Sequence, residues 1–481
     1  MTMADDAPLA SSKTPRRPRW PRTAAAVGSL VVAGAGLLAS TELHGIPSPQ
    51  ATPAAARLAI GAVIALADDA PAPRAHAPQA GPVTAASLPK DSPFAGAFKG
   101  SPESRLIAIY RLIGDQRPEL ALDAAASLTH DVPGFRLAQL VYADLLSTNG
   151  GGTPGFGAAG PAAAASAGVA EEVAELRDEA IQRLHALQER PPANQVPAEF
   201  IVLPRAVHHA IAVDTTRSRL YLFENGPQGV KLVSDHYVSV GKQGVDKTVE
   251  GDQRTPLGVY FVSDRVGQGS LGETFGAGAM QLNYPNLFDK LHGRTGSGIY
   301  VHGVPFNTYS RPPKDSDGCV TLANDELVML MNTVPIHDTP VIITKRIHWV
   351  GHDAAGLHHA EILDAVARWQ GVRASEDTAA LDAFYVPGAA PETPAAPPSP
   401  PSQPVVTWVH GKRRVVSPPA VPPKDPLAFD NLSVMTWSDD KETMVVTFNE
   451  RGTRTHRETT LRQYWERDAS KWKIVAEGTV R

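Results

Sequence analysis

Two residues in the middle of the chain have the types that nucleophilic catalysis requires. Cys319 is the single cysteine of the 481 residues, and His302 lies 17 positions before it. Free cysteine is only a few per cent thiolate near neutral pH, so a catalytic thiol needs a neighbouring imidazole to take its proton. The spacing is too long for a local contact, but it suits a strand ending at His302, a loop and a return to Cys319. The pair therefore predicts a thiol nucleophile with a histidine base.

Glycines next to both residues fit the same chemistry. Gly318 lets the backbone bend closely beneath a substrate carbonyl, and the N–H groups around Gly318 and Cys319 are expected to form an oxyanion hole. Gly303 allows close packing of the returning loop, and its carbonyl is expected to orient the His302 imidazole.

Each of these residues also has a structural alternative. Free cysteine is among the most buried residue types, so Cys319 taken alone also fits an inert core thiol. His302 taken alone fits a core histidine with satisfied hydrogen bonds. Arg311 and Lys314, in the loop before Cys319, fit either a solvated loop or cations that hold substrate carboxylates.

The elements that must position the pair follow from hydrophobic periodicity. Helical spacing is found at residues 104–113, 121–128, 135–146 and 171–190 and predicts a small helical repeat-like module, which would serve as a spacer or docking module. From Phe200 the period changes to two. The strands expected there are 201–203, 210–213, 220–223, 231–240, 258–263, 298–301 and 341–344, with one helix at 325–332. Many short strands and few helices predict an antiparallel sandwich or barrel.

The C-terminal part repeats this change from helix to strand. A helix is expected at 362–385, and alternation predicts strands at 433–437, 443–448, 457–465 and 472–476. These strands are rich in aromatic residues and predict a curved sheet. The fold class expected for the whole chain is multidomain α+β: a helical N-terminal module, a mostly β sandwich and a C-terminal α+β cone.

Composition and charge exclude several classes of protein. The net charge of −5 excludes a globally basic nucleic-acid binder, and no nucleic-acid partner is expected. One cysteine excludes an intrachain disulfide framework, a cysteine zinc ribbon and a cysteine-ligated iron–sulfur cluster.

No cofactor or metal is expected from the remaining motifs. Residues 267–272 fit G-x-G-x-x-G, but no helix opens after them, so a dinucleotide site lacks its structural context. A flap beside the active site is the preferred interpretation. The neighbouring histidines at 208–209 and 358–359 would point to opposite faces of a strand, which disfavours a metal clamp.

The N-terminus indicates export. Arginines between 16 and 22 precede a neutral apolar run from Ala24 to Ala39, the pattern of a signal peptide or signal anchor. Localisation in the periplasm or cell envelope is expected, with the inner membrane as a partner if the segment is not cleaved. The expected organisation is 1–45 signal or anchor, 46–100 Ala/Pro-rich tether, 101–192 helical module, 197–346 catalytic domain and 355–481 C-terminal domain with a Pro-rich insertion at 386–424.

The site residues lie in a motif of a known family. Tyr300-Val301-His302-Gly303, a loop, and then Ser316-Asp317-Gly318-Cys319-Val320 resemble the signature of the L,D-transpeptidase (YkuD-type) catalytic domain, with supporting similarity at 239–260. The resemblance covers about 207–345. It implies a mostly β sandwich with Cys319 as nucleophile and His302 as proton donor and acceptor. Ser316, Asp317 and Gly318 would form the substrate-binding wall and anion site beside Cys319.

The sequence departs from this pattern at two places. Many members have histidine where Asp317 stands, and arginine or asparagine soon after the cysteine, where Val320 and Thr321 stand. The loss of an imidazole or a cation implies a change in the part of the site that holds the leaving group or the acceptor, and it puts cross-linking in doubt.

The C-terminal region is similar to a nuclear-transport-factor-like (SnoaL-type) cone. The residues that carry the similarity are Trp369, Leu381 to Tyr385, Trp408, Tyr464 to Arg467 and Trp472 to Val475. A catalytic domain followed by such a cone resembles the cell-shape-determining L,D-carboxypeptidases of helical bacteria, and the region 135–140 resembles their N-terminal module. The cone would bind a glycan or protein ligand, or serve only for packing or dimerisation.

The resemblance implies an exported enzyme acting on peptidoglycan stem peptides. The carbonyl attacked belongs to the L-centre of the third stem residue, and D-Ala leaves from a Cys319 thioester. Water as acceptor makes the enzyme an L,D-carboxypeptidase that trims tetrapeptides to tripeptides, which the cone favours. An amine acceptor makes it an L,D-transpeptidase that forms 3–3 cross-links or anchors a protein to murein. A non-catalytic murein-binding scaffold is the alternative from another class.

Overall fold

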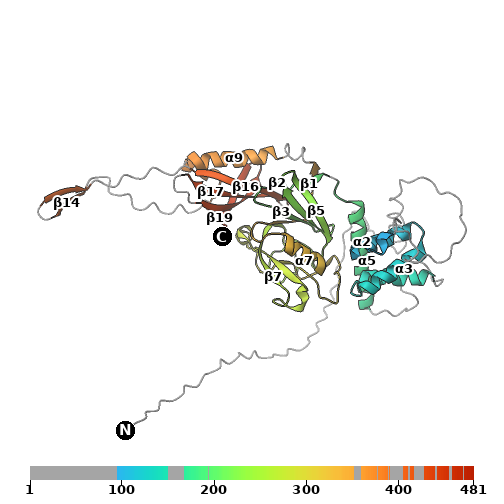
Figure 1. Cartoon of the computed structure of the whole chain (residues 1–481). Coiled ribbons are helices and arrows are strands. Elements are labelled where there is room, and N and C mark those ends of the chain that lie inside the picture. The colour runs from blue at the N-terminus through green and yellow to red at the C-terminus, as the bar shows by residue number, and fades with distance from the viewer. Residues whose placement is uncertain are drawn as a thin grey trace, which may run out of the picture. The chain divides into compact units, whose positions relative to one another are not determined.

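The computed structural model describes residues 95–149, 167–192, 194–351, 359–375, 377–387, 389, 405–409, 412–416, 427–438, 441–453, 458–469 and 471–480 (Figure 1). The predicted export segment and most of the predicted tether and Pro-rich insertion lie outside these residues. All of the described residues belong to one compact unit. None of the helices within the described ranges is long and apolar enough to cross a membrane.

Four helices form the helical module, as the periodicity predicts. They are α2 (Pro102–Gly114), α3 (Pro118–Asp131), α4 (Arg136–Asn149) and α5 (Ala167–Gln188), with a short turn η2 (Ala95–Ala97) before them. Proline opens both α2 and α3, where its missing N–H has no helical partner to lose. Fully buried side chains from α2, α3 and α4, such as Leu106, Leu128 and Leu137, pack into one core.

One curled sheet of eight strands, the central sheet, occupies the middle of the chain. Its strands are β3 (His209–Asp214), β4 (Arg219–Gly226), β5 (Gly229–Tyr237), β7 (Gly258–Gly267), β8 (Gly278–Leu282), β9 (Tyr300–His302), β11 (Val320–Thr321) and β12 (Pro340–Thr344). Their order is β11-β9-β8-β7-β12-β3-β4-β5. Leu220 on β4 and Val320 on β11 belong to one apolar core although their strands lie near opposite ends of this order. The sheet therefore folds back on itself, in keeping with the sandwich-like packing that the sequence predicts.

Short elements complete the central region. The two-residue strand β6 (Val240–Gly241) pairs in parallel with β10 (Lys314–Ser316). Helix α7 (Asn324–Thr333) buries Leu327 and Leu330 in the core of the curled sheet. A 3-10 turn η3 (Glu273–Phe275) and a short helix α6 (Leu287–Leu291) lie in the connections around β8.

The C-terminal sheet is an antiparallel meander covered by a helix. Its strands are β16 (Leu427–Ser438), β17 (Glu442–Gly452), β18 (Glu458–Asp468) and β19 (Lys471–Thr479). Helix α9 (Ala360–Ser375) lies along this sheet in Figure 1 and buries Trp369 against Phe448 and Trp465, which are all 0% exposed. The described part of this region is thus packed with its own aromatic side chains.

Two details of this region differ from the expectation. The helix predicted at 362–385 is divided into α9 and α10 (Thr378–Asp382), because Asp377 caps a new helix start through the N–H of Ala380. Within the predicted Pro-rich insertion, β14 (Val405–Val409) and β15 (Lys412–Val416) form a hairpin.

The strand predicted at 201–203 does not belong to the central sheet. It forms β2 (Phe200–Val202), which pairs with β16, Val202 opposite Val434 and Phe200 opposite Met435. Likewise β1 (Gln195–Pro197) pairs with β13 (Trp349–Gly351). Alternating hydrophobicity shows that a strand has a buried face but does not identify its neighbour, so assigning 201–203 to the catalytic sandwich was wrong.

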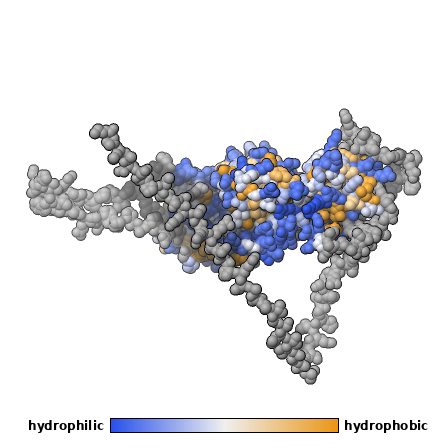
Figure 2. Space-filling view, turned by 90° about the horizontal axis from the view of Figure 1, so that it is seen from below, coloured by the Kyte–Doolittle hydropathy of each residue, from blue (hydrophilic) through white to orange (hydrophobic). Residues whose placement is uncertain are grey.

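Most of the surface visible in Figure 2 is hydrophilic, and hydrophobic residues form smaller groups on it. The apolar clusters that determine the fold are buried instead, one in the helical module, one inside the curled sheet, one between the central and C-terminal sheets and one beneath α9.

Candidate active site

Cys319 and His302 come together at the edge of the central sheet. Strands β9 and β11 are parallel neighbours, with Val320 opposite Val301 and Thr321 opposite His302. Cys319, one position before β11, therefore lies beside Tyr300. Residues two apart on a strand share a face, so Tyr300, the residue beside Cys319, lies on the same face of β9 as His302. The strand, loop and return that the spacing predicts are present, and the connecting segment 303–313 is called the site loop below.

The His302 imidazole is held in one tautomer. Its Nδ1 lies 2.7 Å from the carbonyl oxygen of Gly303, the contact expected from the sequence. A carbonyl can only accept, so Nδ1 carries the proton and Nε2 is free to act as a base. The side chain is 5% exposed, and its ring packs 4.5 Å from that of Phe275. Burial lowers the pKa of His302 to about 4, and the positive charge of Arg311 acts in the same direction.

Cys319 is a protonated thiol in this environment. Its Sγ lies 3.6 Å from the carbonyl oxygen of Gly298, to which the S–H donates. Burial raises the pKa of Cys319 to about 11, and the carboxylate of Asp317 adds to the rise. A backbone hydrogen bond from Tyr300 and the charge of Arg311 oppose it. At neutral pH the site therefore holds a neutral thiol and a neutral imidazole, rather than an ion pair.

The environment of the thiol predicts a steep pH dependence of its alkylation. With a pKa of about 11, the rate of modification by iodoacetamide should rise about tenfold per pH unit between pH 7 and 10, because only the thiolate reacts. Cys319 is the only cysteine, so the mass increase of the whole chain reports this site alone. A rate that is already constant between pH 7 and 8 would contradict the neutral pair and indicate a thiolate–imidazolium pair.

The turn before Cys319 is braced by Ser316. The Ser316 hydroxyl donates to the carbonyl of Cys319 at 2.6 Å and accepts from the N–H of Gly318 at 3.1 Å. Gly318 has φ +122°, and a Cβ there would lie 2.7 Å from the carbonyl oxygen of Arg254. Ser316 is 1% exposed, so it supports the turn instead of forming the substrate wall expected for it. The N–H of Gly318 donates to the Ser316 hydroxyl in this arrangement, and the oxyanion hole expected around Gly318 and Cys319 stays a prediction.

The remaining predicted binding residues separate into two places. The side chain of Asp317 is 79% exposed, and its carboxylate accepts from Gln253 at 2.9 Å. Arg311 lies on the site loop, and its charge lowers the pKa of both His302 and Cys319. Lys314 lines a different cavity, which neither Cys319 nor His302 borders. The other residues lining that cavity are Gln182, Thr215, Thr216, Ser218, Val240, Gly244, Val245, Asp246, Arg254, Pro313 and Lys345.

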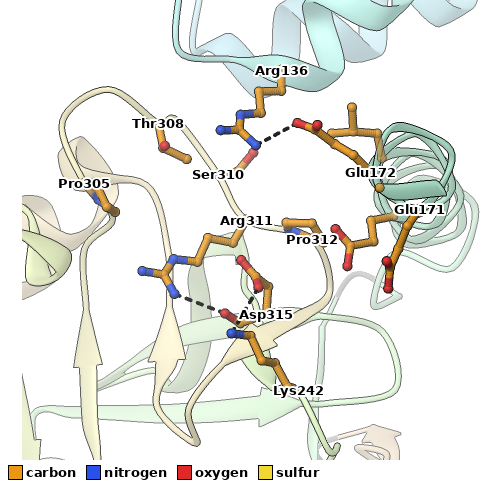
Figure 3. Close-up of a pocket in the computed structure, with 13 residues that line it drawn as sticks. Arg136, Glu171, Glu172, Lys242, Pro305, Thr308, Ser310, Arg311, Pro312 and Asp315 are labelled. Carbon is orange, nitrogen blue, oxygen red and sulfur yellow. Dashed lines mark hydrogen bonds and ion pairs between the residues drawn. The ribbon is translucent and has the colours of Figure 1, made fainter. Parts of the chain in front are cut away.

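A cavity of about 510 Å³ is lined by residues of both the site loop and the helical module (Figure 3). Glu171 and Glu172 enter it from α5, and Lys242, Arg311 and Asp315 from the central region. Lys242 lies 3.9 Å from Asp315, and Arg136 of α4 lies 2.8 Å from Glu172. The helical module thus reaches the loop that carries Arg311.

Sequence reasoning missed two residues that shape the site. Phe275, three residues after the predicted flap at 267–272, packs against the His302 ring. The Asn324 side chain, at the start of α7, accepts from the N–H groups of Ala277 and Val304 at 2.9 and 3.3 Å and donates to the carbonyl of Val304 at 2.8 Å. A Cβ on Gly303 would lie 2.1 Å from the Asn324 Oδ1. The available signal was an asparagine directly before the helix expected at 325–332, a residue type that is common at helix starts.

Replacing Asn324 by alanine should destabilise the protein by about 2 kcal/mol, because three backbone groups around the site lose their partner. The urea midpoint measures this change. Asn332→Ala, at an exposed position on the same helix, is the control and should leave the midpoint unchanged. Equal midpoints for the two variants would show that Asn324 does not hold the site together.

The comparison with protein families identifies the central region. Residues 208–343 match the family model of the L,D-transpeptidase catalytic domain, YkuD. The chain therefore carries a catalytic domain of the L,D-transpeptidase class, and the family resemblance derived from the sequence is confirmed. A search among curated proteins found no match.

Several solved structures are similar to the chain. Bd1075 of Bdellovibrio bacteriovorus is 20% identical over 60% of this chain and 98% of its own length, with a TM-score of 0.46. The helical cell shape determining protein Pgp2 of Campylobacter jejuni is 19% identical over 61% of this chain and 98% of its own, with a TM-score of 0.44. An L,D-transpeptidase of Mycobacterium smegmatis is 16% identical over 28% of this chain and 58% of its own, with a TM-score of 0.20.

Proposed function

We propose that this chain is an exported peptidoglycan-modifying cysteine acyltransferase. It acts at the L-centre of the third stem-peptide residue and releases D-Ala through a Cys319 thioester. The observation that carries the proposal is that β11, which follows Cys319 directly, pairs with β9, which ends at the carbonyl-oriented imidazole of His302, within a domain of the L,D-transpeptidase class.

The first half-reaction needs a proton transfer that accompanies attack. Because the Cys319 thiol and the His302 imidazole are both neutral, the thiol passes its proton to Nε2 as sulfur bonds to the carbonyl carbon of the third residue. The tetrahedral intermediate collapses with cleavage of the peptide bond, and His302 returns the proton to the departing amine of D-Ala. A thioester on Cys319 and a neutral imidazole remain.

The second half-reaction determines the type of enzyme. We favour water as the acceptor: His302 takes a proton from water as the water oxygen attacks the thioester carbon, and the C–S bond then breaks. The protonated imidazole returns the proton to the Cys319 thiolate, and the tripeptide leaves. The carboxylate of Asp317, where many members of the family have histidine, supports a changed accepting side. An amine acceptor, giving a 3–3 cross-link or a protein anchored to murein, is the alternative. Export to the periplasm, as a cleaved or anchored protein, remains part of the proposal and rests on the predicted segment 1–45.

Mass spectrometry of disaccharide-tetrapeptide incubated with the protein tests the proposal, with Cys319→Ala as control. Loss of one D-Ala without dimers, dependent on Cys319, is the expected result. Dimers with a 3–3 linkage would assign the protein to cross-linking. Substrate that survives unchanged with both proteins would contradict the catalytic proposal and favour a murein-binding scaffold.

A further inference from the structure

The helical module holds the site loop at two consecutive residues. The Tyr309 ring lies 4.4 Å from that of Phe135, and the Tyr309 N–H donates to the carbonyl of Gly134 at 3.0 Å. The Ser310 hydroxyl donates to Glu179 Oε1 at 2.7 Å. A spacer or docking module would not need polar contacts of this kind with the loop beside the reacting pair.

Glu179 belongs to a buried ionic network on α5. Its side chain is 1% exposed, and its Oε1 also accepts from Arg183 Nε and Nη2 at 3.0 and 2.8 Å. Arg183 also donates to Glu103 of α2 at 2.8 Å. Removing such charges from water offsets much of their mutual attraction, so an apolar contact would hold the module to the sheet as well or better. Glu179 nevertheless accepts a hydrogen bond from the Ser310 hydroxyl of the site loop, which points to a role of this carboxylate in placing the loop.

The residue after Ser310 is Arg311, whose positive charge acts on both His302 and Cys319. The backbone carbonyl of Arg311 accepts from the Tyr237 hydroxyl at 3.0 Å. The Nη1 of the Arg311 side chain donates to the carbonyl of Asp315 at 3.1 Å. Its charge lowers the pKa of both His302 and Cys319. Because Arg311 follows Ser310 directly, a shift of Ser310 also shifts the Arg311 backbone.

We propose that Glu179 is a positioning residue of the active site: by holding Ser310, it fixes the site loop and with it Arg311, the next residue. The helical module then contributes to the active site by positioning the site loop. The kinetic consequence rests on the proposed function, whereas the effect on the thiol does not.

Ser310→Ala is the sharpest test, because it removes the loop hydroxyl and leaves the Glu179–Arg183 pair intact. Ser310→Thr keeps the hydroxyl and serves as the rescue. Ser147→Ala is the matched control, since this exposed serine of α4 donates to a backbone carbonyl at 2.9 Å far from the loop. The readouts are the rate of Cys319 alkylation by iodoacetamide at pH 8 to 9.5 and kcat/KM for D-Ala release, with thermal unfolding recorded for each variant.

We expect Ser310→Ala to react with iodoacetamide about fivefold more slowly, because a thiol that loses a nearby cation ionises less readily. Its kcat/KM should fall by a similar factor while its melting temperature stays near that of the parent. Ser310→Thr and Ser147→Ala should behave as the parent does. An unchanged alkylation profile in Ser310→Ala, or equal slowing in Ser310→Thr, overturns the proposal. Absence of D-Ala release by the parent protein would refute the proposed function alone, because alkylation needs no substrate.

Discussion

Replacing His302 by alanine should lower kcat for D-Ala release about a thousandfold. The Cys319 thiol has a pKa of about 11, so at pH 7 almost no thiolate forms unless a base takes the proton during attack. In the proposed mechanism the same imidazole protonates the departing amine, so its loss should affect both steps. Initial rates of D-Ala release from disaccharide-tetrapeptide measure the effect.

His208→Ala is the matched control, because His208 is exposed and immediately precedes β3. Its kcat should stay within about twofold of the parent value, as is usual for surface substitutions away from a site. Circular dichroism should show that both variants fold as the parent does. A folded His302→Ala variant that keeps more than about a tenth of the parent kcat would exclude His302 as the general base, since general bases contribute about a hundredfold or more.

Replacing Arg183 by alanine should destabilise the protein by about 3–5 kcal/mol, because it leaves buried carboxylates without their shared cation. Arg183 is 2% exposed and contacts Glu103 and Glu179 on two helices. Burial alone would raise the pKa of Glu103, but Arg219 and Arg183 together hold it below its ordinary value. After the substitution Glu103 keeps Arg219 of β4, whereas Glu179 keeps the Ser310 hydroxyl. Urea midpoints, converted with a common m-value, measure the loss.

The pH dependence of this loss separates charge from packing. Burial already raises the pKa of Glu179 in the parent, and losing Arg183 raises it further. A carboxyl with a raised pKa binds more protons in the folded than in the unfolded state, so its unfavourable contribution shrinks as pH falls. The deficit of Arg183→Ala should therefore narrow between pH 7 and pH 5, and a constant deficit would assign the loss to packing. Arg136→Ala is the control: its pair with Glu172 is exposed, and its loss should remain below about 1 kcal/mol at either pH.

The sequence predicted many of the elements and the class of the central domain well, because both have local signals. Alternation indicated β3, β4, β7, β12 and the C-terminal strands, since residues two apart share a face of a strand. The motif from Tyr300 to Val320 led to the L,D-transpeptidase class, which the family match at 208–343 confirms. The Gly303 carbonyl contact with His302 was predictable because the two residues are neighbours in sequence.

Strand pairing and side-chain contacts depend on residues far away in the sequence, which local patterns do not identify. Strand 201–203 was assigned to the wrong sheet because its alternation fits β16 as well as the central strands. Ser316 was expected at the substrate wall, yet the reversal of the chain at Gly318 turns its hydroxyl inward.

By itself, then, the sequence determined the types of element, the thiol and imidazole and the family of the central domain. Only the tertiary structure decided that α5 supports the site loop. The hydrogen bonds responsible join Glu179 to Ser310, Arg183 to Glu103 and Arg219 to Glu103, across 131, 80 and 116 positions of the chain. The direction of both pKa shifts also depends on the tertiary structure, because burial lowers the pKa of His302 and raises that of Cys319. Burial and long-range pairing exist only after the chain has folded, and neither leaves a periodic signal in the sequence.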